Sequence, residues 1–260
     1  MGVTGPGPKE EVSVSALARG LALLRMLADA GEPLSNRDLA ERAGIPKATV
    51  SRLTGTLQAA GFLRQLPDER FALGPAALHV GNAYLRGFDF RQQARSHLAE
   101  LAEAAGAIVQ LGVRDGVDML VIDTVRPQTA VILSRVDIGS RMRIATSAMG
   151  RSYCASLPSP ERRALLEEIR LASGAEWAGL SDRFDAALAE HAKLGYCSSF
   201  GEWHPDIHAL GFALHGPRGE LYGVSVGGPA FLLTREVMLE RVAPKLLQVR
   251  QAIERETGYA

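Results

Sequence analysis

SNRDLAERAGIPKATVSRLTGTLQAAG, residues 35–61, is the stretch that decides the fold of the first part of this 260-residue chain. Ser35 is followed three residues later by Asp38, a spacing typical of a capping box at a helix start. Gly44 supplies a turn, and Pro46 fits the first turn of a second helix, where its missing N–H costs nothing. Two short helices joined by a tight turn predict a helix-turn-helix, whose second helix enters a DNA major groove.

The next segment, FLRQLPDERFALG at residues 62–74, has two short alternating runs around a Pro-Asp-Glu turn. This pattern predicts a β-hairpin. A hairpin directly after a recognition helix is the wing of a winged helix-turn-helix. Arg64 and Arg70 are then placed to meet phosphates.

The second helix carries polar and basic side chains opposite its apolar stripe of Val50, Leu53 and Leu57. Such side chains near a helix N-terminus donate to base edges and phosphates. The alternative is a small three-helix module with an ordinary solvated face, but the hairpin that follows favours DNA binding. The candidate DNA-binding residues are Ser35, Lys47, Ala48, Thr49, Ser51, Arg52, Arg64 and Arg70.

Composition is that of an ordinary soluble globular protein, with 47% hydrophobic and 22% charged residues and a formal net charge of zero. Residues 1–75 hold nine Lys and Arg against eight Asp and Glu, a net charge of +1. Any DNA-binding surface must therefore come from how these charges are arranged.

Cellular setting is indicated by what the sequence lacks. No apolar run reaches the ~20 residues that span a bilayer, and the N-terminus lacks the basic-then-apolar order of a signal peptide. Cys154 and Cys197 are far apart and outside any C-x-x-C motif. We expect a cytoplasmic protein with no membrane partner, and a disordered Gly/Pro-rich tail over residues 1–12.

The domain order predicted from the pattern is a winged helix-turn-helix at 13–74, a linker helix at 75–89 and a second domain at 90–260. The second domain is expected to be α+β, with an antiparallel sheet and helices before, between and after its strands. Its predicted strands are 107–115, 118–125, 130–136, 207–216 and 220–228. Its predicted helices are 90–105, 147–157, one from Ser159, one from Ser181 to Gly195, and one after Thr234 that Pro244 should kink.

Catalysis has little support in the second domain. A Cys154–His208 pair is conceivable, but nothing resembles G-x-S-x-G. Cys154 also lies among small apolar residues, as inert buried thiols do. We therefore expect that the protein is not an enzyme and needs no cofactor.

A zinc site is an open alternative, because Cys197, His204, Asp206 and His208 fall within twelve residues. His204 and His208 straddle a predicted loop-to-strand boundary instead of sharing one helix face at i, i+4, so surface histidines are favoured and no metal is expected.

A small-molecule pocket fits the second domain better. ATSAMGRS, residues 145–152, places small and hydroxyl residues at a helix start, whose free N–H groups suit a carboxylate. GVSVGG, residues 223–228, puts Ser225 and Gly227 on one strand face, and residues 197–199 with His208 are expected to close the site. The alternatives are a sheet edge without ligand and a protein-interaction or oligomerisation module.

The chain resembles the IclR family of bacterial transcriptional regulators over about residues 15–255. The motifs that carry the resemblance are ALARGLALLRMLADAGEPLSNRDLAERAGIPKATVSRLTGTLQAAGFLRQLPDERFALGP, SRVDIGSRMRIATSAMGRSYCASLP, KLGYCSSFGEWHPDIHALGFAL and GELYGVSVGGPAFLLT. The resemblance implies a GAF-like effector-binding domain, dimers or tetramers on palindromic double-stranded DNA operators, and control of a catabolic operon by a small organic or aromatic acid.

Carried over by motif, the family's effector cleft falls on Ser147, Ala148, Met149, Ser198, Ser199, His208, Ser225 and Gly227. Three stretches differ from the common family pattern. Residues 198–200 lack acidic side chains, residues 225–228 lose a hydroxyl at Gly227, and residues 211–214 read Gly-Phe-Ala-Leu. Each difference alters pocket charge or size, so no relative's effector is carried over.

Overall fold

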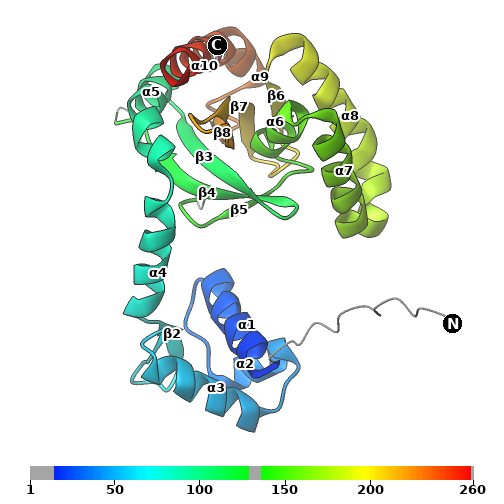
Figure 1. Cartoon of the computed structure of the whole chain (residues 1–260). Helices are drawn as coiled ribbons and strands as arrows, with labels where there is room; N and C mark the ends of the chain where they lie inside the picture. Colours follow the sequence, from blue (N-terminus) through cyan, green and yellow to red (C-terminus); the bar gives the residue numbers. More distant parts are fainter. Residues whose placement is uncertain (1–14, 129–135, 259–260) are drawn as a thin grey trace, which may run out of the picture. The chain divides into compact units, whose positions relative to one another are not determined.

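The computed structural model describes residues 15–128 and 136–258, so the predicted tail at residues 1–12 lies outside the described residues. The chain divides into two compact units, Met1–Gly87 and Phe88–Ala260 (Figure 1). Among the described residues, no helix is both long enough and apolar enough to cross a membrane.

The first unit is a winged helix-turn-helix. Its helices are α1 (Ser15–Ala30), α2 (Asn36–Ala43), α3 (Lys47–Ala59) and α4 (Pro75–Arg86), and its wing strands are β1 (Leu63–Gln65) and β2 (Phe71–Leu73). β1 and β2 pair antiparallel, and Leu34 forms a bridge to Phe71 beside them. The core of this unit consists of Leu23, Leu27, Leu34, Leu39, Val50, Leu63 and Phe71.

Local sequence rules account for the turn between α2 and α3. The Asp38 amide donates to Ser35 Oγ at 3.2 Å and the Ser35 amide donates to the Asp38 carboxylate at 2.9 Å, which confirms the capping box. Gly44 ends α2 in the left-handed conformation with φ 64°, which glycine adopts without strain. Pro46 lies one position earlier than predicted: it is the N-cap of α3, and its carbonyl accepts from the amides of Thr49 and Val50.

The buried side of α1 differs from the predicted stripe. Helical spacing favoured Leu17, Leu21, Leu24 and Ala28, but the structure buries Gly20, Leu23 and Leu27. Leu17 and Leu21 are 62% and 51% exposed. α1 has leucines on two adjacent faces, so periodicity fits both, and packing against α3 decides between them.

The second unit is α+β, as predicted, with one six-stranded antiparallel sheet in the order β5-β4-β3-β8-β7-β6. The strands are β3 (Ile108–Asp115), β4 (Asp118–Val125), β5 (Arg141–Arg143), β6 (Cys197–Phe200), β7 (Ile207–His215) and β8 (Leu221–Pro229). The helices are α5 (Asp89–Ala105), α6 (Ala148–Ser156), α7 (Ser159–Ser173), the 3-10 turn η1 (Gly174–Glu176), α8 (Trp177–Leu194), α9 (Arg235–Val237), the π-helical turn η2 (Met238–Val242) and α10 (Ala243–Thr257).

The sheet has two different faces, since side chains alternate along each strand. α5 and α10 cover one face, where Phe90 of α5 stacks on Tyr222 with ring centroids 4.7 Å apart. α6 covers the other face. At Gly211 of β7, an added Cβ would lie 2.3 Å from the backbone carbonyl carbon of Ala148, so the α6 backbone rests directly on the strand.

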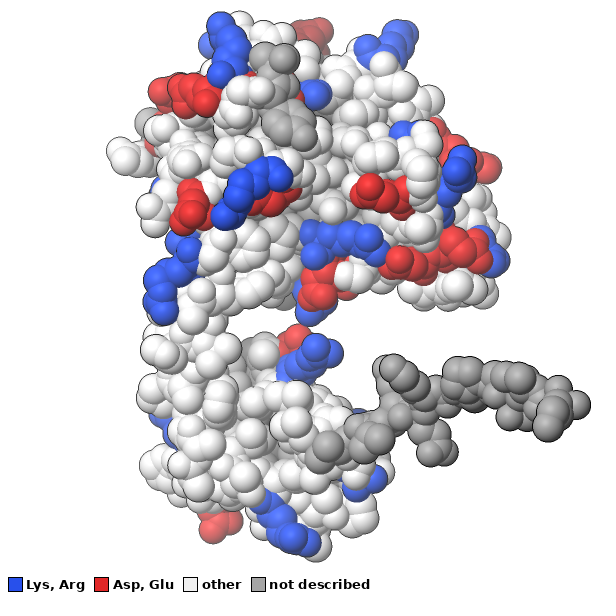
Figure 2. Space-filling model, viewed as in Figure 1, with Lys and Arg blue, Asp and Glu red and all other residues white. Residues whose placement is uncertain are grey.

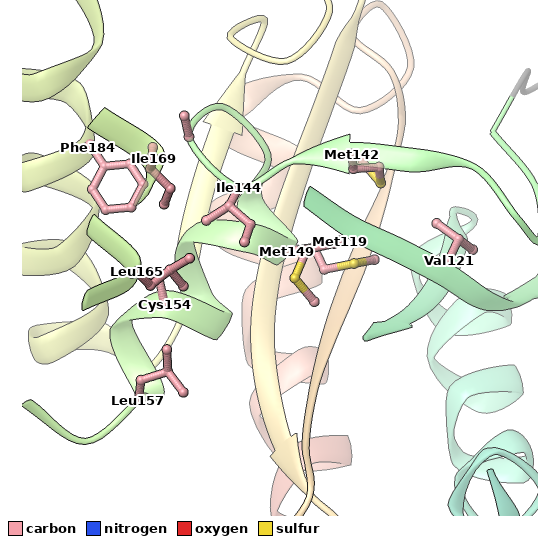
Figure 3. Close-up of a cluster of buried hydrophobic side chains, with 11 residues drawn as sticks. Met119, Val121, Met142, Ile144, Met149, Cys154, Leu157, Leu165, Ile169 and Phe184 are labelled. Carbon is pink, nitrogen blue, oxygen red and sulfur yellow. The ribbon is translucent and has the colours of Figure 1, made fainter. Parts of the chain in front are cut away.

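A cluster of buried apolar side chains lies on the α6 side of the sheet. Met149 of α6 and Met119 of β4 pack together beside Gly223, while Leu165 of α7 and Phe184 of α8 pack against the outer side of α6 (Figure 3). This core fixes the N-terminal end of α6 over the centre of the sheet.

Several predicted elements differ from those observed. The strand predicted at 130–136 lies outside the described residues except for Val136, and β5 lies in a segment for which no strand was predicted. β6 was also not predicted, because short edge strands carry too few alternations to be recognised. α8 begins at Trp177 and not at Ser181, since η1 leads directly into it.

The final helix behaves as predicted at its start. Thr234 Oγ1 accepts from the Val237 amide at 3.3 Å and caps it. The predicted irregularity at Pro244 takes the form of the π-helical turn η2 immediately before it. A proline that lacks its N–H cannot continue the regular ladder at that point.

Candidate functional site

The exposed face of α3 carries most of the predicted DNA-binding residues. Lys47, Ala48, Ser51 and Arg52 are exposed and Thr49 is half-buried. Ser35 is also half-buried, and its hydroxyl is engaged in the capping box at the start of α2.

Thr54, which was not among the predicted site residues, helps to hold the exposed face of α3 in place. It is buried in α3, and its hydroxyl donates to Asn36 Oδ1 at 3.0 Å. This bond ties α3 to the first turn of α2. Thr54 stood one position from the predicted apolar stripe, and nothing in the sequence pattern marked it.

The net charge of residues 1–75 is only +1, so DNA binding depends on which basic side chains are free of acidic partners. Three arginines form ion pairs with nearby carboxylates: Arg37 with Glu41, Arg42 with Glu32, and Arg70 with Asp68. Lys47, Arg52 and Arg64 form no ion pair with any described residue. On the face shown in Figure 2, basic and acidic residues are interspersed over the second unit, with no continuous basic field.

The wing arginines differ from each other. Arg70 Nε donates to the Asp68 carboxylate at 2.7 Å, and this contact raises the pKa of the guanidinium and lowers the pKa of the carboxyl. Both arginines are exposed, but Arg70 is paired with Asp68 within the wing, whereas Arg64 on β1 forms no ion pair with a described residue.

A pocket of about 550 Å³, including its open mouth, lies in the second unit between the start of α6 and the sheet. Its polar lining residues are Gln110, Ser147, Ser199 and Ser225. The remaining lining residues are apolar or small: Ile108, Val136, Met142, Ala148, Trp203, Ile207, Ala209, Gly227, Gly228 and Pro229.

Five of the eight predicted effector residues line this pocket, namely Ser147, Ala148, Ser199, Ser225 and Gly227. The alternation of strand side chains brings them together. Ala209 of β7 lies opposite both Ser199 and Gly227, and Ser225 lies opposite Gln110, all on the α6 face.

The structure directs the other three away from the pocket. Met149 is fully buried beside Gly112 and Gly223. Ser198 faces opposite to Ser199, and its hydroxyl donates to the Glu190 carboxylate at 2.9 Å. His208 Nδ1 lies 2.8 Å from the Leu233 carbonyl oxygen.

The start of α6 offers hydrogen-bond donors to the pocket. Ser147 is the N-cap, and its Oγ accepts from the Gly150 amide at 3.1 Å. The backbone N–H groups of Ala148 and Met149, in the first turn, donate to no described protein group. Free donors at a helix N-terminus favour an anionic or carbonyl oxygen.

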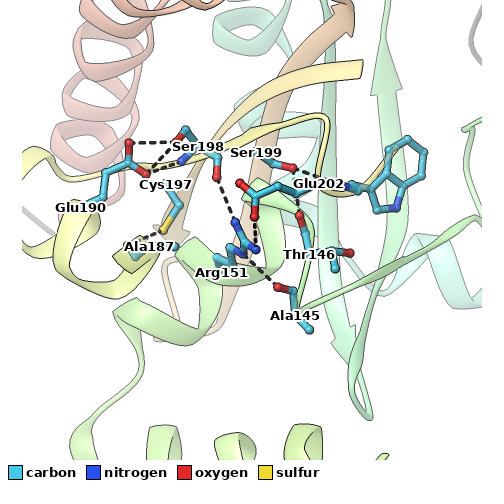
Figure 4. A network of polar contacts seen from close by, with 10 residues as sticks. Ala145, Thr146, Arg151, Ala187, Glu190, Cys197, Ser198, Ser199 and Glu202 are labelled. Atoms are coloured by element: carbon cyan, nitrogen blue, oxygen red, sulfur yellow. Dashed lines mark hydrogen bonds and ion pairs between the residues drawn. The ribbon is translucent and has the colours of Figure 1, made fainter. Parts of the chain in front are cut away.

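A polar network that the sequence pattern did not reveal supports one wall of the pocket (Figure 4). Arg151 of α6 is 1% exposed, and its guanidinium donates to the Ala145 carbonyl at 2.9 Å and to the Glu202 carboxylate at 2.5 Å. Ser199 Oγ donates to the Thr146 carbonyl and accepts from the Trp203 amide at 3.3 Å. The loop between β6 and β7 is thereby attached to the start of α6.

Gln110 and Trp203 were also missed as pocket residues. A single amide in the apolar run AIVQLGV was a usable signal for Gln110. Trp203 had none, because it lies on a loop whose path depends on the Arg151 contact.

The described residues bring together neither a set of zinc ligands nor the Cys154–His208 pair. Among the described residues, no three His, Cys, Asp or Glu side chains gather as metal ligands. Cys197 Sγ donates to the Ala187 carbonyl at 3.2 Å, and His204 Nδ1 accepts from the Asp206 amide at 3.3 Å. Cys154 is buried in the core, where burial raises its pKa to about 11, and His208 is bonded to Leu233.

A winged helix-turn-helix followed by an antiparallel α+β domain is the architecture of a class of two-domain DNA-binding transcriptional regulators. Residues 16–67 match the IclR helix-turn-helix domain, and residues 82–255 match the bacterial transcriptional regulator IclR C-terminal domain. The chain belongs to the IclR family of transcriptional regulators.

Individual relatives agree with this assignment. The chain is 31% identical over 251 residues to the HTH-type transcriptional regulator TsaQ1/TsaQ2 of Comamonas testosteroni, which covers 95% of this chain and 90% of that protein. The crystal structure of an IclR family transcriptional regulator from Brucella abortus matches with a TM-score of 0.82 and 33% identity, over 98% of this chain and 96% of that one.

An IclR homologue from Microbacterium hydrocarbonoxydans, crystallised with 4-hydroxybenzoate, matches with a TM-score of 0.72 over 94% of this chain and 100% of that one. Its identity of 19% shows a shared fold alone. The comparisons confirm the predicted family and fold class.

Proposed function

We propose that this regulator binds palindromic operators as a dimer or tetramer and responds to a small organic or aromatic acid held in the α6 pocket, and that it controls a catabolic operon. The observation that carries the proposal is the pocket itself. Its lining combines serine hydroxyl groups and the free backbone amide of Ala148 with mostly apolar side chains. An acid with a compact apolar body matches that combination.

DNA recognition is assigned to α3 and the wing. Lys47 and Arg52 are unpaired cations on the exposed face of α3, where they can reach phosphates and base edges. Arg64 extends the same charge onto β1. Three such cations give a single copy weak affinity at physiological salt, so we infer that binding requires paired copies.

Exposed apolar side chains support self-association of the first unit. Leu17 and Leu21 of α1 and Leu78, Val80 and Tyr84 of α4 are each about half exposed or more. Large apolar side chains that are exposed on two helices favour burial against a partner surface. A second copy, related by two-fold symmetry, would match the symmetry of a palindromic operator.

Ligand recognition is assigned to the start of α6. A carboxylate placed there accepts from the free amide of Ala148 and from the Ser147 hydroxyl. The Microbacterium homologue with 4-hydroxybenzoate supports the choice of an aromatic acid as one test compound. The ligand acts as a switch if its affinity differs between DNA-competent and DNA-incompetent states by about 1–3 kcal/mol.

Footprinting on the DNA upstream of the gene tests the DNA part. We expect a protected palindrome, and we expect Arg52→Ala to weaken its binding at least tenfold in a gel shift at fixed salt. Arg37→Ala is the matched control, because Arg37 is exposed but paired with Glu41. Equal affinities for the two variants would contradict the assigned face.

A thermal-shift screen against small carboxylates, including 4-hydroxybenzoate, tests the ligand part. A ligand present at 100 times its Kd adds about 2.7 kcal/mol to the free energy of unfolding. Ser225→Leu should fill the pocket and remove the shift, whereas Ser198→Leu, on the other sheet face, should retain it. Loss of the shift in both variants, or in neither, would place the ligand elsewhere.

A further inference from the structure

Gln110 is the one amide side chain among the described pocket residues, and it is 7% exposed. It lies on β3 opposite Ser225 of β8, whose hydroxyl donates to Gln110 Oε1 at 3.2 Å. With the amide in this orientation, Oε1 is occupied by Ser225. Its Nε2 group donates to no described residue.

The Nε2 donor therefore faces the pocket, where a water molecule or a ligand oxygen can accept its hydrogen bond. Gln110 lines the same pocket as Ser147, the N-cap of α6. Donors from β3 and from the start of α6 thus face one cavity, and a ligand oxygen can satisfy both.

The pocket contains no formal charge. None of the described residues that line it is Asp, Glu, Lys, Arg or His. The buried guanidinium of Arg151 is held by the Ala145 carbonyl and by Glu202 and is neutralised there. Neutral donors can stabilise one carboxylate, but the lining holds no cation to balance a second ionised group, and Ile108 and Met142 are apolar.

We propose that Gln110 is the specificity-determining residue of the pocket: its side-chain amide donates to one oxygen of the ligand carboxylate and selects monocarboxylates with an uncharged body. This inference rests on the proposed ligand-binding function. It adds a residue outside the cleft motifs and excludes dicarboxylates and organic cations from the site.

The test is calorimetric titration of the full-length protein with benzoate, propionate, terephthalate, succinate and benzamidine. Wild type should bind at least one of the two monocarboxylates, at least tenfold more tightly than the matching dicarboxylate, and should not bind benzamidine. Gln110→Leu, of similar volume, should weaken that monocarboxylate at least tenfold. Gln110→Glu should abolish its binding and admit benzamidine, because the donor becomes an anion.

Gln93→Leu is the control, since Gln93 is exposed on α5. Circular dichroism and thermal melting establish that each variant is folded, and Gln110→Met replaces any variant that is not. Unchanged monocarboxylate affinity in folded Gln110→Leu would overturn the role of Gln110 and leave the proposed function intact. Equal affinity for the matching dicarboxylate would overturn the selection for one charge. Failure of wild type to bind any of the four acids would overturn the carboxylate-binding function itself.

Discussion

The guanidinium of Arg151 lies 2.5 Å from the carboxylate of Glu202 and joins helix α6 to the loop between β6 and β7. The arginine side chain is 1% exposed and the glutamate side chain 24%. Because Trp203 follows Glu202 and lines the pocket, this ion pair sets the position of one pocket wall. The positive charge of the buried guanidinium thus has a single carboxylate as its counter-ion.

Removing Glu202 should therefore be costly. We expect Glu202→Ala to lower the free energy of unfolding by about 3 kcal/mol, because an uncompensated guanidinium stays buried. Urea denaturation measures the change. Glu176→Ala is the control: Glu176 pairs with Arg143 on the surface, and its loss should cost less than about 1 kcal/mol. Similar losses in the two variants would show that the Arg151 charge is satisfied without Glu202.

Two glycine-to-alanine variants should have opposite effects. Gly211→Ala places a Cβ 2.3 Å from the Ala148 carbonyl carbon, so α6 must move, at a cost of about 2–3 kcal/mol. Gly55 in α3 has no heavy atom within 4 Å of an added Cβ, so Gly55→Ala should stabilise the helix by up to about 1 kcal/mol. Thermal melting measures both. A Gly211→Ala protein as stable as wild type would contradict the direct packing of α6 on β7.

Removing the carboxylate partner of Arg70 should strengthen DNA binding if the wing lies along the DNA backbone. Asp68→Asn removes the partner of Arg70, and we expect affinity to rise several-fold at low salt, with a salt dependence steeper by about one phosphate contact. Glu69→Gln makes the same change in net charge without freeing an arginine, since Arg70 pairs with Asp68. Gel shifts over a salt series compare them. An equal gain in both variants would mean that only net charge matters.

The two thiols should be unreactive in the folded protein. Burial raises the pKa of Cys154 from 9.0 to about 11 and that of Cys197 to about 12, so both stay protonated near neutral pH. We expect no fast reaction with Ellman's reagent at pH 8 and two reactive thiols per chain in denaturant. Rapid labelling of the native protein would contradict the burial of these side chains.

The same shift predicts a pH dependence of stability. Between pH 9 and about 11 the unfolded chain releases the Cys154 proton while the folded protein retains it. The stability contributed by the buried thiol is present below pH 9 and is lost as the pH rises through this window. Melting temperatures of wild type and Cys154→Ala, measured from pH 8 to 11, should converge as the pH rises.

Local rules in the sequence determined the elements that depend on near neighbours. The capping box at Ser35, the left-handed turn at Gly44, the wing, and the period of the long strands follow from contacts within a few residues. Those contacts are fixed by backbone sterics and hydrogen bonding, which the sequence states directly. The winged helix-turn-helix and the antiparallel α+β class were predictable on this basis.

Only the tertiary structure decided which side chains share the pocket. Ser198 and Ser199 are neighbouring residues of the same type. The register of β6 on β7 nevertheless directs Ser198 to Glu190 and Ser199 to the pocket. Arg151 and Glu202 are 51 residues apart, and Gln110 and Ser225 are 115 apart. Side-chain direction changes with every residue of a strand, so a site made of separated segments depends on registers that no local pattern encodes.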